Sequence, residues 1–173
     1  MSFSPRTVTL TETLTMSDQQ IETVIKATQA CNYPCNLVFK IREREVGSEK
    51  YDKFQKMVKS RIKIVYKNLY KVLRRSDVVI LMCSTTGIEA MNFERPVIVF
   101  PTGHPMYPPH APVFRASNEK ELIERLNEVF EMFPPLTTYL GTNTKGRKWS
   151  FLKNYSKARW KWFWKTKEAK KQK

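Results

Sequence analysis

Hydroxyl side chains lie between an apolar run and a stretch of helical composition in the middle of the chain. The run is Val78–Met82, and the hydroxyl groups belong to Ser84–Thr86. Gly87 follows, and a carboxylate, Glu89, lies two residues further on. Hydroxyl groups and unpaired amides at a helix start favour anions, and a carboxylate one turn into the helix can reach a ribose diol. The stretch is therefore a candidate phosphate-binding turn.

Helix capping and the charge of the helix start also explain some of these residues without a ligand. Either Ser84 or Thr85 can cap the helix, which needs only one hydroxyl group, so Thr86 is not required for capping. Gly87 lets the backbone of the first turn approach a ligand closely, since it has no side chain. Glu89 is also a favourable charge near a helix start, whether or not a ribose binds there.

The elements around this turn alternate between apolar runs and amphipathic stretches. A capping box at Ser17–Gln20 opens one helix, Leu69–Arg75 forms a short one, and Ser117–Lys120 opens a long one. The other predicted strands are Thr7–Thr11, Leu37–Ile41, Ile62–Tyr66 and Pro96–Phe100. The alternation predicts an α/β fold, a single doubly wound parallel sheet of the Rossmann-like kind with helices on both faces. Ligands of such sheets bind at the carboxyl ends of the strands.

Other polar residues follow the predicted strands at that same edge. Lys40 and Arg42 end the second strand, where they would supply charge to a phosphate, although a solvated charged loop explains them equally well. Asn68 follows the third strand. His104 and His110 lie in a proline-rich loop predicted from Pro101 to Arg115. They are candidates for protonating a leaving phosphate, although a lone histidine in a loop is more often a surface residue.

The segment SDVVILMCSTTGIEAMNFERPVIVF resembles the signature of the nucleotide-binding half of B-type glycosyltransferases. Sugar-nucleotide 2-epimerases and polyol-phosphate polymerases share this signature. The resemblance runs from about Thr7 to about Tyr155 and implies that the turn holds the donor's pyrophosphate while Glu89 contacts the ribose. Relatives commonly hold the base through backbone atoms at Tyr66–Asn68. They often carry a Lys-x-His-Pro-x-Glu motif at this place, where this chain keeps Lys40 but has no His and no Pro, a departure that argues against ordinary catalysis.

The resemblance implies binding of a nucleotide-diphosphate sugar, with no separate cofactor, by the donor half of a glycosyltransferase. The acceptor domain would come from a partner chain or from a homo-oligomer. Three alternatives stay open: a non-catalytic nucleotide-sugar-binding or regulatory module, a 2-epimerase-like remnant, and a basic nucleic-acid-binding protein. The epimerase is disfavoured, because the sequence has few candidate acid–base residues.

The charge divides the chain into a domain, residues 1–140, and a basic tail, residues 141–173. The net charge is +15, and twelve of the 31 Lys and Arg residues lie from Lys145 onward with one acid, Glu168. The segment Trp149–Lys173 also holds all four tryptophans, which favours an anionic membrane surface or a partner domain over nucleic acid. The three cysteines lack metal-ligand spacing, so no metal is expected. We therefore expect a cytoplasmic protein with reduced thiols, attached peripherally to the inner face of the membrane.

Overall fold

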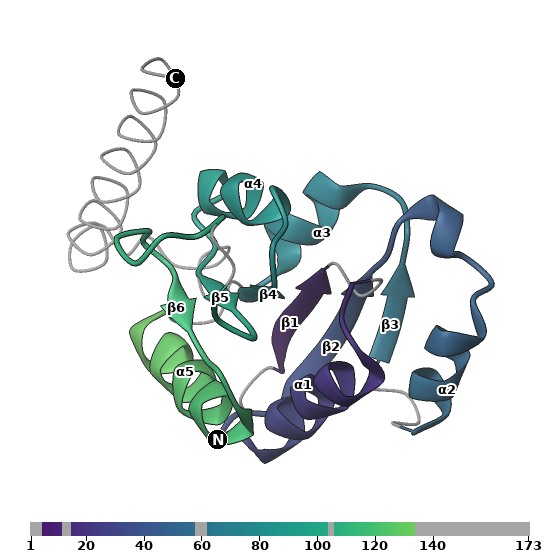
Figure 1. Cartoon of the computed structure of the whole chain (residues 1–173), viewed down its shortest axis with the longest axis horizontal. Helices are drawn as coiled ribbons and strands as arrows, with labels where there is room; N and C mark the ends of the chain where they lie inside the picture. The colour runs from purple at the N-terminus through teal and green to yellow at the C-terminus, as the bar shows by residue number, and fades with distance from the viewer. Residues whose placement is uncertain (1–4, 12–14, 58–61, 104–105, 134–173) are drawn as a thin grey trace.

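The computed structural model describes residues 5–11, 15–57, 62–103 and 106–133 (Figure 1). Strands and helices alternate along most of the chain. The strands are β1 (Arg6–Thr11), β2 (Cys35–Lys40), β3 (Ile62–Val65), β4 (Val78–Leu81), β5 (Val97–Val99) and β6 (Phe114–Arg115). The helices are α1 (Asp18–Ala30), α2 (Glu49–Met57), α3 (Leu69–Arg75), α4 (Thr86–Asn92) and α5 (Glu119–Met132), with a 3-10 turn at Glu43–Glu45.

The six strands form one parallel sheet in the order β3-β2-β1-β4-β5-β6. Strand β1 lies in the centre, and its Val8 is paired with Leu37 of β2 on one side and with Val78 of β4 on the other. The chain builds outward from β1 to β3 and then returns to place β4 on the opposite side of β1. The predicted doubly wound α/β fold is confirmed, with the strand order reversing between β1 and β4.

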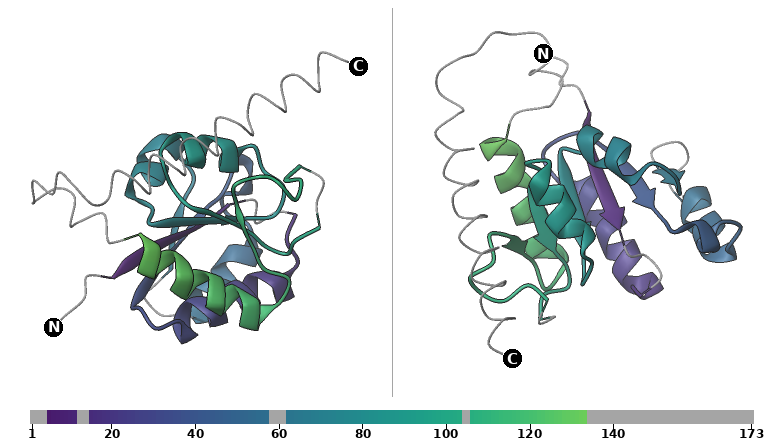
Figure 2. Two further views of the ribbon diagram at one scale, coloured as in Figure 1. Left: turned by 90° about the vertical axis from the view of Figure 1, so that its left-hand side faces the viewer. Right: turned by 90° about the horizontal axis from the view of Figure 1, so that it is seen from above.

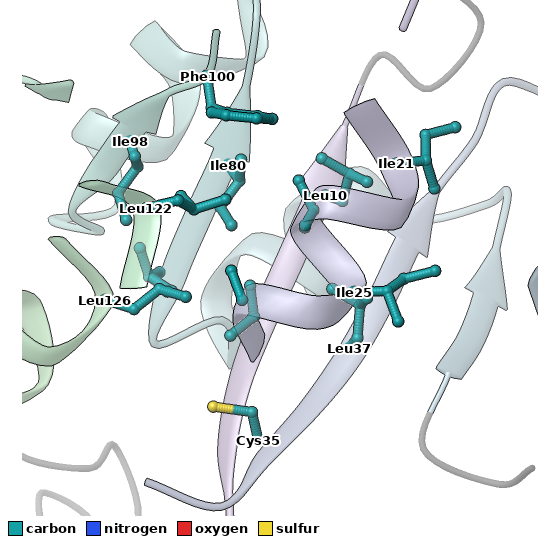
Figure 3. Close-up of a cluster of buried hydrophobic side chains, with 14 of the residues drawn as sticks. Leu10, Ile21, Ile25, Cys35, Leu37, Ile80, Ile98, Phe100, Leu122 and Leu126 are labelled. Atoms are coloured by element: carbon teal, nitrogen blue, oxygen red, sulfur yellow. The ribbon is translucent and has the colours of Figure 1, made fainter. Parts of the chain in front are cut away.

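Both faces of the sheet are covered by helices. In Figure 2, α1 and α5 lie on one side of the strands and α3 and α4 on the other. The first face buries a large apolar cluster with residues from β1, β2, β4, β5, α1, α2 and α5, part of which Figure 3 shows. The second cluster includes Leu73 of α3, Leu81 of β4, Met91 of α4 and Tyr107 of the loop after β5. Strands buried on both faces explain the continuous apolar runs of the sequence.

The predicted helix starts are confirmed at atomic detail. Ser17 Oγ accepts a hydrogen bond from the amide of Gln20 at 3.2 Å, and the amide of Ser17 donates to Gln20 Oε1 at 2.8 Å. Asn118 caps α5 in the same manner, because its Oδ1 accepts from the amide of Glu121 at 2.9 Å. These side chains satisfy amides that have no partner within the helix.

Two parts of the prediction differ from the structure or fall outside it. The segment predicted to be loop through Arg115 ends in a short sixth strand, since Phe114 and Arg115 are paired with Ile98 and Val99. The predicted boundary at residues 140 and 141, and the segment Trp149–Lys173, lie outside the described residues. Within the described part of the chain, none of the helices is long and apolar enough to cross a membrane.

Candidate functional site

The turn between β4 and α4 is held by its own hydroxyl groups. Ser84 Oγ accepts a hydrogen bond from the amide of Thr86 at 3.1 Å and donates to Thr86 Oγ1 at 3.0 Å. Thr85 has helical backbone angles (φ −61°, ψ −19°), and its exposed side chain forms no capping hydrogen bond. Ser84 therefore closes the turn and is itself buried, whereas the hydroxyl group of Thr85 faces solvent, where a ligand can approach it.

A buried tyrosine packs against Gly87 at this turn. A Cβ atom placed on Gly87 would lie 2.8 Å from Leu81 Cδ2 and 3.0 Å from Tyr107 Cζ, and closer still to Tyr107 Oη. The same hydroxyl group donates a hydrogen bond to the carbonyl oxygen of Ser84. Gly87 is thus needed to seat Tyr107 against the turn. Its predicted role in letting a ligand approach the backbone stays a prediction.

Tyr107 belongs to the loop between β5 and β6, which folds back over the start of α4. Its side chain is 3% exposed and joins the apolar cluster of Leu81 and Val99. Arg115, at the end of β6, braces this loop by donating from Nη2 to the carbonyl oxygen of Pro108 at 2.5 Å, and its partial burial lowers the pKa of its guanidinium. Tyr107 could not be predicted from the sequence, since no periodicity distinguishes one aromatic residue within a proline-rich loop.

The two histidines are not held in the turn by the described contacts. His110 lies in this loop with an exposed side chain, and His104 lies outside the described residues. An exposed imidazole has no fixed orientation toward a reacting atom, which general acid catalysis requires. The predicted catalytic role of either histidine stays a prediction.

Glu89 lies one turn into α4, three residues after Thr86. Its side chain is half-buried, and no hydrogen bond or ion pair joins its carboxylate to the residues that the structure describes. The carboxylate is consequently available to a ligand that reaches the start of this helix.

The side chain of Lys40 is hydrogen-bonded to the backbone just after β2 and just after β3. Its Nζ donates to the carbonyl oxygen of Ile41 at 2.8 Å and to that of Tyr66 at 2.9 Å, which joins the carboxyl ends of β2 and β3. Partial burial lowers the pKa of Lys40, and the negative charge of Glu45 opposes this shift in part. The side chain therefore has a structural task that the sequence did not indicate, and its charge lies at the same edge as the β4–α4 turn.

The remaining candidates lie on exposed turns at this edge. Arg42 follows β2, and its side chain is exposed. Asn68 follows β3 with a left-handed backbone (φ 54°, ψ 55°), and its carbonyl oxygen accepts the amide of Val72 at 3.1 Å at the start of α3. Asparagine tolerates this conformation better than most residues, which accounts for its presence at the turn.

The strand order sets how far apart these candidates lie. Ser84, Thr85, Thr86 and Glu89 form one group after β4. One strand, β1, separates β4 from β2, so Lys40 and Arg42 follow a strand about 10 Å away, and Asn68 follows one about 15 Å away. All of them lie at the carboxyl edge. Among the described residues, no three His, Cys, Asp or Glu side chains gather as metal ligands.

Solved structures of other proteins have a fold similar to that of this chain. No family model matches the sequence, and no curated protein matches it. Among solved structures, UDP-GlcNAc 2-epimerase from Neisseria meningitidis bound to UDP-GlcNAc superposes with a TM-score of 0.57 at 13% identity, over 90% of this chain and 38% of the epimerase. The catalytic domain of cholesterol-α-glucosyltransferase from Helicobacter pylori gives 0.57 at 13% identity, over 91% of this chain and 99% of that domain.

The fold is shared with nucleotide-sugar enzymes. A third structure, UDP-GlcNAc 2-epimerase from Methanocaldococcus jannaschii in complex with UDP-GlcNAc and UDP, gives a TM-score of 0.55 at 12% identity, over 73% of this chain. The predicted resemblance to glycosyltransferases and 2-epimerases is confirmed at the level of fold. The chain spans 38% and 39% of the two epimerases and so corresponds to a part of each.

Proposed function

We propose that this chain binds a nucleotide-diphosphate sugar at the carboxyl edge of its sheet and serves as the donor-binding half of a glycosyltransferase. The β4–α4 turn carries the proposal, because it lies directly beside the point where the strand order reverses. The solved structures of similar fold support the ligand class, since two of them are epimerases with UDP-GlcNAc bound.

Different residues at the carboxyl edge of the sheet contact different parts of the proposed ligand. The pyrophosphate lies against the exposed hydroxyl group of Thr85 and the amides at the start of α4, whose dipole favours anions. The carboxylate of Glu89 accepts hydrogen bonds from the ribose diol. Arg42 adds positive charge from the loop after β2, and the backbone turn at Asn68, after β3, receives the base. Ser84 and Tyr107 hold the turn in shape without touching the ligand.

The proposed transfer needs a second domain. An acceptor hydroxyl group attacks the anomeric carbon of the sugar, the bond from that carbon to the diphosphate oxygen breaks, and negative charge develops on the diphosphate. Donors at the β4–α4 turn stabilise this charge. Apart from Glu89, which we assign to the ribose, the described residues supply no base fixed beside the turn, so we assign the acceptor site and the base to a partner chain of different sequence.

Thermal unfolding of the full chain tests ligand binding. A ligand that binds only the folded state raises the midpoint temperature, and at 100 times its dissociation constant it stabilises by about 2.7 kcal/mol. We expect a shift with one of the UDP-, GDP- or CDP-sugars and none with the free sugar. The midpoint shift should grow with ligand concentration. No shift with any nucleotide sugar at millimolar concentration would reject the proposal.

A further inference from the structure

Two buried cysteine side chains face one another at the edge of the sheet opposite the proposed nucleotide site. Cys31 directly follows α1 and Cys35 begins β2, and their sulfur atoms are 3.4 Å apart. The two residues are 8% and 7% exposed. Figure 3 shows Cys35 within the apolar cluster that includes Leu37 and Leu126.

In the short connection between α1 and β2, both sulfur atoms contact the same carbonyl group. The carbonyl oxygen of Tyr33 lies 3.3 Å from the sulfur of Cys31 and 3.4 Å from that of Cys35. Pro34 restricts the backbone of this connection, because its ring fixes φ. A disulfide has a sulfur–sulfur bond of about 2.05 Å, so closure needs the two sulfur atoms to approach by little more than 1 Å.

The surroundings of the two thiols shift their pKa values in opposite directions. The pKa of Cys31 is lowered, because the thiol of Cys35 donates a hydrogen bond to its sulfur, and this effect outweighs burial. The pKa of Cys35 is raised, because donating this hydrogen bond favours its protonated form and burial adds to the effect. The positive charge of Arg6 acts on Cys35 in the opposite direction. A thiol with a lowered pKa beside a second thiol is typical of reactive dithiols.

We propose that Cys31 and Cys35 form a reversible intramolecular disulfide when the protein meets a peroxide. The thiolate of Cys31 attacks one peroxide oxygen, the oxygen–oxygen bond breaks, and a sulfenic acid and a hydroxide form. The sulfur of Cys35 then attacks the sulfur of Cys31, the sulfur–oxygen bond breaks, and the second oxygen leaves as hydroxide. The proton of the Cys35 thiol and one from solvent convert both hydroxides to water, so the two sulfur atoms together lose two electrons to the peroxide. A small thiol such as dithiothreitol reverses the bond by exchange.

The sequence provides a direct readout of this reaction. Trypsin cleaves after Lys26 and Lys40, so Cys31 and Cys35 share one peptide, residues 27–40. Cys83 lies in residues 76–115, because trypsin does not cleave the Arg95–Pro96 bond. The experiment treats the folded full chain with hydrogen peroxide, alkylates free thiols with iodoacetamide, digests without reductant and measures peptide masses. Peptide 27–40 should be two hydrogen atoms lighter than its dithiol form and carry no alkyl group. It should gain two alkyl groups after dithiothreitol.

Three results would overturn the proposal. After peroxide and iodoacetamide, peptide 27–40 could carry two alkyl groups, which means that no disulfide formed. It could instead gain oxygen atoms without losing hydrogen, or its cysteines could be crosslinked to Cys83. The Cys35→Ser variant tests the order of events, because the sulfenic acid of Cys31 should then be trapped by dimedone. The matched Cys31→Ser variant should give much less adduct on Cys35. The wild-type masses decide the main claim even if either variant fails to fold.

Discussion

The packing of Tyr107 on Gly87 makes a quantitative prediction about the β4–α4 turn. Replacing Gly87 with alanine in a helix would by itself stabilise the protein by about 1 kcal/mol. Here the new methyl group would lie 2.8 Å from Leu81 Cδ2 and 3.0 Å from Tyr107 Cζ, in a buried site that has no room for it. Overpacking of a core costs about 1–3 kcal/mol. The displaced Tyr107 would also lose its hydrogen bond to Ser84, worth about 1 kcal/mol.

These terms combine to a net loss of about 1–3 kcal/mol for Gly87→Ala. Tyr107→Phe removes the hydroxyl group that would meet the methyl group most closely, and with it the hydrogen bond. Gly87→Ala should therefore cost less when Tyr107→Phe is already present. We expect a coupling energy of at least about 1 kcal/mol from the two single variants and the double variant.

Urea unfolding followed by circular dichroism measures each of these free energies. Ala30→Gly, at an exposed residue of α1, is a matched control for changes in helix propensity, since it makes the reverse chemical change on the other face of the sheet from Tyr107. It should be destabilising, and its effect should be unaltered by Tyr107→Phe. Strict additivity of Gly87→Ala and Tyr107→Phe would refute the packing argument, as would a stabilising Gly87→Ala.

Three further predictions concern binding and transfer. Glu89→Gln should weaken binding of a nucleoside diphosphate by about 1–2 kcal/mol, measured by calorimetric titration, because a charged hydrogen bond to the ribose becomes a neutral one; an unchanged affinity would assign Glu89 a structural role. The purified chain alone should show no sugar transfer in a radiolabelled-donor assay. Robust turnover without a second chain would contradict the assignment of the acceptor site and the base to a partner chain. The full chain should co-sediment with vesicles containing acidic lipid more strongly than a chain ending at Gly141, and salt should weaken that binding. Equal sedimentation of the two forms, or tight binding to single-stranded nucleic acid without lipid binding, would reject membrane attachment through Trp149–Lys173.

Local signals explain why much of the fold was predictable. The Ser17–Gln20 capping box and the alternation of apolar runs depend on neighbours in sequence, and α3 begins and ends at the predicted residues, Leu69 and Arg75. Strand β6 could not be recognised in this way, because its two residues gain their conformation only by pairing with Ile98 and Val99. A strand of two residues carries no periodicity.

The candidate site was predictable only in part, for the same reason. The turn from Ser84 to Thr86 lies between a strand and a helix that the sequence shows clearly. The bond from Lys40 to the carbonyl oxygen of Tyr66 joins residues 26 positions apart, and that from Tyr107 to Ser84 joins residues 23 apart. Such contacts depend on which strands become neighbours. The contact between Cys31 and Cys35 is local, yet sequence spacing alone does not set the direction of the two thiols.

Calorimetric titration of a nucleoside diphosphate into the full chain tests the central claim most directly. The wild type is compared with Thr85→Val, which removes the exposed hydroxyl group at the β4–α4 turn while keeping the shape of the side chain. Thr7→Val is the matched control, because Thr7 lies at the opposite edge of the sheet, near the start of β1. A hydrogen bond to a charged phosphate is worth about 1.5–3 kcal/mol, so Thr85→Val should weaken binding by at least about tenfold. Thr7→Val should bind as the wild type does, and equal affinity of all three proteins would contradict the assignment of the pyrophosphate to this turn.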